Sequence, residues 1–469
     1  MISDPVPIRL GILSSHPIQY YSPWFRALAK QVDLEVFYAH RPDATQQGAG
    51  FGKSFSWDVD LLSGYKHYFL KNMSPRPGVN HFSGCDTPEI AGIISGKQKI
   101  ERTGENFNIQ HSAFSISPFD AFIVVGWYLK SFRQATRACR RAGIPVLVRG
   151  DSQLRTPRSP LKRLAMEVRQ RWLLRQFDGF LYVGQRNREY LAHYGVPARK
   201  MFFAPHFVDN EWFRGKAEIA RKQKAEIRKK WGIAEGSFCV LFCGKFISKK
   251  RPFDLVEAAR ILTAERSKNA EESSKQPVHL LFAGSGELGG QLRERCDVVF
   301  DAENSVEKQR SSISNLPSPT PARPQATFAG FLNQSELPEA YVAADVLVLP
   351  SDGGETWGLV VNEGMGCGLT AIVSDAVGCA PDLIDEGKTG FTFPIGNCED
   401  LAKRLESVRQ MKNKEHDFDQ ALAEKMRAYS VAGAVKGTIH AMEHCLAGSA
   451  RGSRMEAKVA PESAKAPLP

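Results

Sequence analysis

One stretch, Asp345 to Gly390, constrains the fold more than any other part of the 469-residue chain. It opens with a short apolar run, 346–349, which is ended by Pro350 and predicts a buried parallel strand. A glycine-containing loop, apolar residues at helical spacing and a second predicted strand at 370–374 follow. A helix that starts directly after such a loop offers free N–H groups and the positive end of its dipole. Both favour a bound phosphate at the loop.

Two glutamates flank this predicted phosphate site. Glu355 lies in the glycine loop and Glu363 inside the helix, with seven residues between them. Taken alone, two carboxylates at this spacing are also common on the solvated face of an ordinary helix. The glycine loop, the two flanking strands and a lysine-rich loop earlier in the chain favour a ligand site instead.

The stretch resembles the signature of retaining glycosyltransferases of family 4, the glycosyl transferases group 1, which have the GT-B fold. Glu355, Gly358, Leu359 and Glu363 match that signature in place. The resemblance implies that Glu363 holds the ribose hydroxyls of a nucleotide sugar. It also implies that the backbone amides of Gly358 and Leu359 hold the diphosphate, and that Glu355 faces the sugar.

The lysine-rich loop follows a predicted strand and carries Gly244, Lys245, Lys250 and Arg251. The first three match a family segment in which two cations bind the donor diphosphate, with Lys245 in place of the more usual arginine. Lysine is a point charge whereas arginine offers a bidentate fork, so either binding is weaker here or Arg251 assists. A lysine and arginine run is most often simply solvated. Its position at the end of a strand favours a site, and we predict Glu355, Lys245 and Lys250 as catalytic residues.

Three glycines, Gly284, Gly286 and Gly289, follow the next predicted strand in the G-x-G-x-x-G spacing of dinucleotide sites. That alternative needs an acidic residue about 20 positions on, at the end of another strand. A Ser/Pro/Arg-rich stretch at 301–325 instead predicts a flexible insertion there. We therefore favour a glycine turn beside the donor phosphates. Phe331 lies in a segment that resembles the family's border of the nucleotide base.

The length predicts two domains of roughly 200 residues each, because a single core stops growing well below 469 residues. The resemblance implies an α/β fold of the GT-B type, with two Rossmann-like domains that face each other across a cleft. An interdomain passage near 206–215 divides an acceptor-side domain, 1–206, from a nucleotide-sugar-binding domain, 207–430. A helix at 431–448 is expected to pack back on the first domain, and 449–469 to form a disordered tail.

Residues at two strand ends of the first half are predicted to lie on the acceptor side. His16, together with Gln19 and Tyr20, follows the first strand, and open α/β sheets bind ligands at such carboxyl ends. Arg149 and Asp151 follow a later strand, at the point where the family commonly has a histidine. A lone histidine is more often structural, so both a structural role and a substrate contact stay open for His16.

The net charge of +11 is concentrated in two segments, 161–175 and 214–230. Both have apolar residues at helical spacing, which indicates either solvated basic helices or attraction to anionic lipid headgroups or a phosphorylated acceptor. No nucleic-acid-binding module accompanies the charge, so nucleic acid is not expected as a partner. The sequence has no apolar run of ~18 residues and no signal-peptide pattern, which predicts a cytoplasmic protein, with peripheral contact at the inner face of the membrane as an option. The segment 41–118 is expected to be an irregular excursion over the acceptor side.

Together with the resemblance, which implies retention of the anomeric configuration, these features predict a retaining, metal-independent glycosyltransferase that moves a hexose from a nucleotide diphosphate sugar to a hydroxyl. The expected acceptor is a glycan or a lipid-linked glycan, in glycan or surface polysaccharide biosynthesis. Fixed cations at the diphosphate would supply the positive charge, so no metal and no cofactor beyond the nucleotide sugar are expected. Two alternatives stay open: a GT-B relative acting as a sugar epimerase or phosphorylase, and a non-catalytic scaffold that binds polyanions.

Overall fold

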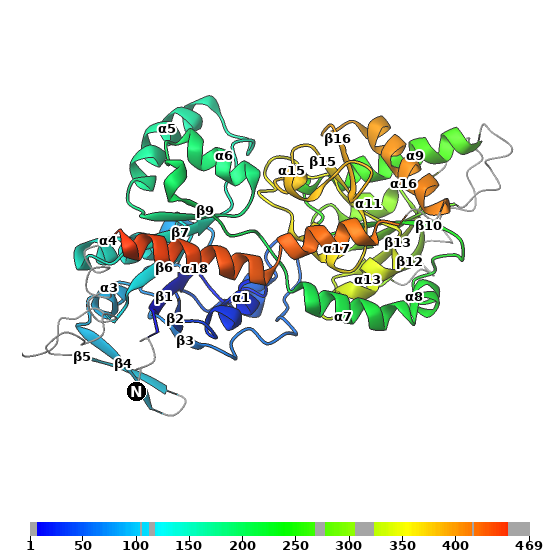
Figure 1. Ribbon diagram of the computed structural model, residues 1–469. Helices are drawn as coiled ribbons and strands as arrows, with labels where there is room; N and C mark the ends of the chain where they lie inside the picture. Colours follow the sequence, from blue (N-terminus) through cyan, green and yellow to red (C-terminus); the bar gives the residue numbers. More distant parts are fainter. Residues whose placement is uncertain are drawn as a thin grey trace, which may run out of the picture.

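The structure of the protein is a computed structural model that describes residues 7–103, 106–111, 118–267, 277–304, 323–414 and 417–448. Within these residues the chain forms two seven-stranded sheets and one two-stranded sheet. The two large sheets belong to two halves that lie side by side, each sheet with helices on both faces (Figure 1). The predicted α/β fold with two similar halves is confirmed.

The first sheet is wholly parallel, in the order β3-β2-β1-β6-β7-β8-β9. Its strands are β1 (Arg9–Ser14), β2 (Asp33–Tyr38), β3 (Lys66–Phe69), β6 (Ala121–Val125), β7 (Val146–Gly150), β8 (Gly179–Tyr182) and β9 (Met201–Phe203). Ile12 and Val36 pack against helices on one face, and Leu13 and Phe37 against helices on the other. Burial on both faces explains the apolar runs of the central strands β1, β6 and β7, whereas the edge strand β3 (KHYF) is only partly buried.

The second sheet is also parallel, in the order β12-β13-β11-β10-β14-β15-β16. Its strands are β10 (Phe238–Cys243), β11 (Val278–Ala283), β12 (Asp297–Asp301), β13 (Gln325–Gly330), β14 (Val346–Leu349), β15 (Ala371–Ser374) and β16 (Gly390–Phe393). Leu241 and Leu347 enter the core on one face, and Val240 and Val348 the core on the other. The strands predicted at 346–349 and 370–374 are therefore present, the second one residue shorter.

Helices connect the strands in both halves. Those of the first half are α1 (Tyr21–Leu28), α2 (Ala44–Gln47), α3 (Ile90–Ile94), α4 (Lys130–Ala142), α5 (Pro160–Leu174) and α6 (Gln185–His193). Those of the second half are α7 (Asn210–Arg221), α8 (Lys224–Lys230), α9 (Pro252–Ser267), α11 (Gly289–Glu294), α13 (Leu337–Ala343), α14 (Leu359–Gly366), α15 (Ala380–Leu383), α16 (Cys398–Asn413) and α17 (Asp419–Ala428).

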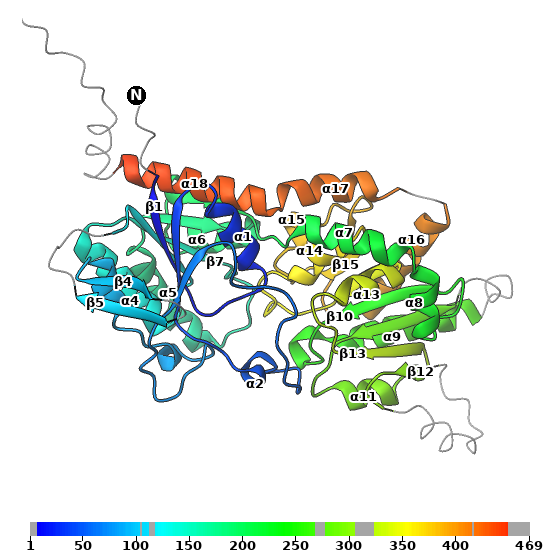
Figure 2. The same cartoon turned by 90° about the horizontal axis from the view of Figure 1, so that it is seen from below.

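The described chain passes between the halves at two points. The first passage lies between β9 and α7, where the predicted boundary falls, and Asp209 caps α7 by accepting a hydrogen bond from the Trp212 backbone N–H at 3.1 Å. The second joins α17 to α18 (Val431–Ala447), which Ser430 caps. The helix α18 then packs on α1, β8 and β9 of the first half (Figure 2). The predicted return of the C-terminal helix is confirmed.

The segment 41–118 holds more regular structure than its sequence pattern predicts. It contains α2, α3, the sheet strand β3 and a hairpin of β4 (Gln98–Thr103) and β5 (Asn106–His111). Residues 48–58 extend to the second half, so the excursion does not lie over the first half alone. The predicted tail, 449–469, and most of the predicted insertion, 305–322, lie outside the described residues.

Candidate active site

The candidate site lies where the carboxyl ends of β10 and β14 meet. These strands are parallel neighbours, so the loops that follow them, 244–251 and 350–358, come together at one edge of the sheet. The Nζ of Lys250 lies 2.5 Å from Oε2 of Glu355, and the two side chains are only 12% and 14% exposed. The structure thus joins a predicted cation and a predicted carboxylate in one largely buried ion pair.

The turn into α14 requires a glycine. Gly358 has a φ of 103°, in the left-handed region. A Cβ on this residue would lie 2.7 Å from Cδ2 of Leu349 and 3.2 Å from Cγ1 of Val377. Any other residue would be strained in its backbone and would clash with the end of β14. The tight turn places the amino end of α14, with Leu359 as its first residue, directly after the Glu355 loop.

Glu363, inside α14, is buried between two tyrosines. Tyr20 donates a hydrogen bond to its Oε1 at 2.9 Å, and Tyr341 donates one to its Oε2 at 2.6 Å. Burial raises the pKa of Glu363 to about 7, although both hydrogen bonds favour the ionised form. Tyr20, which the sequence placed near substrate, therefore links the two halves. Tyr341 was not predicted, because nothing distinguishes it from the other apolar positions of α13.

Lys245 does not join the ion pair. Its Nζ donates a hydrogen bond to the Ala49 carbonyl at 2.5 Å and lies 4.9 Å from the centre of the Phe51 ring. Burial lowers the pKa of Lys245, and the neighbouring Lys249 and Lys250 lower it further. Lys245, which the sequence predicts to bind the diphosphate, therefore contacts the first half of the chain instead of Glu355.

Three predicted donor-site glycines allow two loops to pack closely. Gly244, Gly284 and Gly286 have φ angles of 138°, 141° and 151°. A Cβ on Gly284 would lie 2.0 Å from the Gly244 carbonyl oxygen, and one on Gly286 would lie 2.7 Å from that of Phe246. The loops after β10 and β11 can approach each other only because side chains are absent there.

The structure places an acidic residue, Asp301, at the end of a strand after the glycine turn, as a dinucleotide site would require and as we did not expect from the sequence. The strand β12 follows the glycine turn and ends at Asp301, so the predicted insertion does not begin at that residue. Arg293 donates hydrogen bonds to both oxygens of the Asp301 carboxylate, at 2.7 and 3.0 Å. In addition, β12 pairs with β13 and not with β11. Both carboxylate oxygens of Asp301 are thus bound by Arg293, and β13 lies between β12 and the strand that leads into the glycine turn. This arrangement does not favour a dinucleotide site.

Two other predicted donor residues lie away from the ion pair. Arg251, with a φ of 49°, binds both carboxylate oxygens of Asp254 in α9, at 2.7 and 3.0 Å. Phe331 packs against Phe51 and Phe55, with ring centres 5.0 and 4.3 Å apart. Their contacts with a donor stay predictions.

Asp151 of the first half lies beside the Glu355 loop. Its Oδ2 accepts a hydrogen bond from Thr356 Oγ1 at 2.6 Å and lies 4.0 Å from Nε2 of the buried His206. Gln153 Nε2 donates a hydrogen bond to the Glu355 carbonyl at 2.8 Å. Gln153 was missed, although it follows the same strand end as Asp151. One loop of the first half thus supports the carboxylate loop of the second.

The other two acceptor-side candidates make local contacts. Arg149 is buried, and its Nη1 and Nη2 donate hydrogen bonds to the Ala204 and Pro205 carbonyls at 2.7 and 2.8 Å. These contacts hold the first interdomain passage in place. Nδ1 of His16 lies 2.9 Å from Ser15 Oγ. Burial lowers the pKa of His16 to about 4, so the ring is neutral at pH 7.

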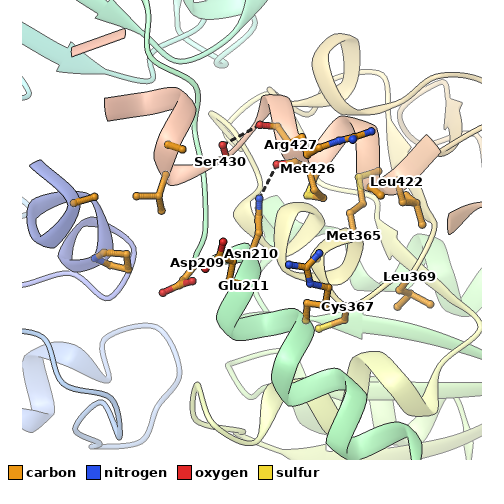
Figure 3. Close-up of a pocket in the computed structure, with 18 of the residues that line it drawn as sticks. Asp209, Asn210, Glu211, Met365, Cys367, Leu369, Leu422, Met426, Arg427 and Ser430 are labelled. Atoms are coloured by element: carbon orange, nitrogen blue, oxygen red, sulfur yellow. Dashed lines mark hydrogen bonds between the residues drawn. The ribbon is translucent and has the colours of Figure 1, made fainter. Parts of the chain in front are cut away.

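A separate cavity of about 1660 Å³ opens between α1, α7, α17 and α18. Figure 3 shows Asn210, between Asp209 and Glu211, hydrogen-bonded to the Met426 carbonyl at this cavity, with Met365 and Cys367 at the carboxyl end of α14 on one side. No residue predicted as a site residue lines this cavity. It lies beside the two interdomain passages, and Tyr341, which donates a hydrogen bond to Glu363, is among its lining residues.

Comparison with known proteins finds a family match in the second half and curated relatives that match part of the chain. Residues 223–425 match the model of the family described as "Glycosyl transferases group 1". The sulfoquinovosyl transferase SQD2 of Arabidopsis thaliana is 39% identical over 107 residues, which cover 22% of this chain and 21% of the relative. The D-inositol 3-phosphate glycosyltransferase of Pseudarthrobacter chlorophenolicus is 30% identical over 224 residues, 47% of this chain and 44% of the relative. The chain thus matches less than half the length of these curated relatives.

Solved structures extend the likeness to the whole fold. A glycosyltransferase from Rickettsia africae ESF-5 superposes with a TM-score of 0.63 at 13% identity, covering 94% of this chain and 100% of its own. HepE from Anabaena, in complex with UDP and glucose, gives a TM-score of 0.58 at 14% identity, covering 93% and 99%. At these identities the likeness concerns the fold alone. Residues 223–425 therefore resemble the glycosyl transferases group 1, and the whole chain has the GT-B fold.

Proposed function

We propose that the protein is a retaining, metal-independent glycosyltransferase that moves a hexose from a nucleoside diphosphate sugar to a hydroxyl acceptor, in glycan or surface polysaccharide assembly. The observation that carries this proposal is the buried ion pair of Lys250 and Glu355 beside the glycine-started helix α14. The names of the relatives support the reaction class, and a structural neighbour that contains UDP and glucose supports this type of donor.

In the proposed reaction, the bond between the sugar C1 and the diphosphate oxygen breaks while a bond from C1 to the acceptor oxygen forms. Negative charge grows on the leaving diphosphate, and the Lys250 ammonium and the amide N–H groups at Gly358 and Leu359 stabilise it there. One ammonium about 4 Å from a phosphate oxygen attracts it by roughly 4 kcal/mol at an effective dielectric constant near 20, before desolvation. The leaving phosphate accepts the proton of the acceptor hydroxyl, which balances the charges.

Three carboxylates complete the proposed site. Glu355, placed by Lys250, faces the sugar, and Asp151 approaches the same loop from the acceptor side. Glu363 accepts hydrogen bonds from the ribose hydroxyls, and Tyr20 and Tyr341 hold its two oxygens in place for that contact. The interdomain location of these groups allows water to be excluded when the halves close.

The first prediction tests the donor class. UDP, GDP, ADP or dTDP at 100 times its Kd should stabilise the protein by about 2.7 kcal/mol, whereas inorganic phosphate at equal ionic strength should change its melting temperature little. The matching nucleotide sugar should then yield a glycoside with retained configuration, also in the presence of EDTA. Epimer formed without an acceptor would support the epimerase alternative. Equal response to every polyanion would support the scaffold alternative, and either result would contradict the proposal.

A second part of the proposal concerns the exposed face of α5. Leu161, Leu164, Val168 and Trp172 are 82%, 68%, 73% and 56% exposed and follow helical spacing. Basic residues alternate with them along the helix: Lys162, Arg163, Arg169, Arg171 and Arg175. No described helix has the length and apolarity needed to cross a bilayer. We infer that α5 lies in the interface of an anionic membrane, where a lipid-linked acceptor would be presented.

Vesicle sedimentation tests this membrane contact. The wild-type protein should bind vesicles that contain anionic lipid and should bind neutral phosphatidylcholine vesicles more weakly, since both the apolar face and the charge contribute. The double variant Leu164→Ser with Trp172→Ser should bind roughly tenfold or more weakly, because two large apolar side chains are lost. Ile395→Ser is the control, since Ile395 is a 41% exposed apolar residue outside both basic segments. Wild-type protein that ignores anionic vesicles would contradict the inference.

A further inference from the structure

Residues 48–58, here called the 48–58 segment, extend from α2 in the first half across the loops of the second half. In Figure 2 α2 lies between the two halves, on the opposite side of the molecule from α17 and α18. The segment contacts residues in the loops after β10, β11 and β13. These are carboxyl ends of parallel strands, where α/β sheets bind ligands. The segment therefore covers part of the edge at which the donor is proposed to bind.

The central contact of the segment is aromatic. Phe55 and Phe51 pack against Phe331, with ring centres 4.3 and 5.0 Å apart, and Trp57 packs edge-on against Phe55 at 5.0 Å. Phe331 lies directly after β13, in the part of the second half expected to border the nucleotide base. Aromatic faces at such a position are suited to stack on a base.

Polar contacts hold the segment on both sides of this cluster. Ser285 Oγ donates a hydrogen bond to the Phe51 carbonyl at 2.7 Å. Asn333 Nδ2 donates one to the Ser56 carbonyl at 2.8 Å, and the Ser335 hydroxyl donates one to Asp58. The residues of the second half that make these contacts lie in the loops after β11 and β13. The segment is therefore bound to the donor side at several points.

Lys245 connects the segment to the proposed phosphate site. Its ammonium is bound by the Ala49 carbonyl and by the Phe51 ring. The loop that carries Lys245 also carries Lys250, the partner of Glu355. A diphosphate beside Lys250 competes with the Ala49 carbonyl for the Lys245 ammonium, and a doubly charged phosphate is the stronger acceptor. A diphosphate that draws Lys245 away would loosen one of the contacts that hold the segment, while the contacts of Ser285, Asn333 and Ser335 remain.

We propose that the 48–58 segment forms the outer wall of the donor site and that Phe55 and Phe331 are the two faces of a clamp for the nucleobase. This inference rests on the proposed function and adds a binding surface from the first half to it. The two rings touch at 4.3 Å, so a base enters as they part by about one ring thickness. Gly50 and Gly52, with φ angles of 84° and 68°, give the segment the backbone freedom for that movement.

The test compares a ligand that has a base with one that lacks it. Titration of the full-length wild type with UDP, GDP, ADP and dTDP identifies the base that binds, and inorganic pyrophosphate serves as the base-free probe. Phe55→Ala should weaken the nucleoside diphosphate roughly 5- to 150-fold, as loss of one stacking face does, while pyrophosphate affinity stays within about twofold. Phe55→Trp should restore nucleotide affinity. Phe82→Ala is the matched control, because Phe82 is an exposed phenylalanine of the same half.

The ratio of the two affinities separates the outcomes. A Phe55→Ala variant that binds the nucleoside diphosphate as tightly as the wild type overturns the clamp and leaves the proposed function intact. Equal weakening of nucleotide and pyrophosphate also overturns it, because the segment would then act only as a structural contact between the halves. A wild type that binds none of the four nucleoside diphosphates overturns the proposed function together with the clamp.

Discussion

Replacing Lys250 with alanine should reduce kcat/KM for sugar transfer roughly 10²- to 10³-fold, the loss typical for one fixed group that stabilises developing negative charge. Lys250 is largely buried and its Nζ lies 2.5 Å from Glu355. The variant therefore loses the positive charge at the leaving phosphate and leaves the Glu355 carboxylate without its partner. Initial rates with the matched donor and acceptor measure the effect.

Lys249→Ala is the matched control for this experiment. Lys249 is the adjacent residue and its side chain is exposed. The Lys249→Ala variant loses the same charge as Lys250→Ala and should retain at least half of the wild-type rate. Circular dichroism of both variants should match the wild type, because the strands of the second sheet are untouched. Near-wild-type turnover by Lys250→Ala, or an equal loss in both variants, would show that the buried ion pair is not the centre of catalysis.

Replacing Glu363 with glutamine should lower donor affinity and raise stability at alkaline pH. If Glu363 binds the ribose hydroxyls, loss of a charged acceptor weakens the nucleoside diphosphate by about 10- to 100-fold, the effect of a hydrogen bond of roughly 1.5–3 kcal/mol to a charged group. The neutral amide can still accept from one tyrosine and donate to the other. The fold is therefore expected to persist, and nucleotide titration measures the affinity.

The stability effect follows from the raised pKa of Glu363. Burial moves this pKa from 4.5 to about 7, so the folded protein holds the proton more tightly than the unfolded chain. The contribution of protonated Glu363 to the free energy of unfolding is complete below pH 4.5. It is lost as the pH rises through 7, which lowers the free energy of unfolding by about 3 kcal/mol. Glu363→Gln removes this loss. In urea unfolding the variant should equal the wild type near pH 5 and exceed it at pH 8.

Glu294→Gln, an exposed helical glutamate, supplies the control for the same chemical change and should show neither effect. Stability of Glu363→Gln below that of the wild type at pH 8 would mean that the two tyrosines favour the ionised form more than burial disfavours it. Unchanged nucleotide affinity would remove Glu363 from the donor site. These two readouts are independent, so a structural role and a binding role can be told apart.

Much of the second half could be predicted because its information is local. The apolar run 346–349, the glycine turn at Gly358 and the spacing of Glu355 and Glu363 all lie within one strand, loop and helix unit. Lys250 was expected to lie near the site because its loop follows the end of a predicted strand. The structure adds that β10 and β14 are paired.

The contacts between the halves could not be predicted in the same way. Tyr20 meets Glu363 across 343 positions of sequence, and Lys245 meets Ala49 across 196. Neither pair has a periodic pattern, because each depends on how two independently folded halves are placed. The same holds for Arg149, whose position at a strand end suggested a ligand contact but whose buried guanidinium binds the first interdomain passage. The position of a residue at a strand end predicts that it lies near the cleft, but it does not predict whether its side chain points into the cleft.

The two interdomain passages are bound to each other. Asn210, just after the first, donates hydrogen bonds to the carbonyls of Met426 and Tyr429, just before the second, at 2.8 and 3.1 Å. The two crossings thus lie next to each other and are joined by these hydrogen bonds. The 48–58 segment contacts the second half at the opposite margin of the molecule. The two halves are therefore held together at two opposite margins, by the adjacent passages on one side and by the contacts of the 48–58 segment on the other.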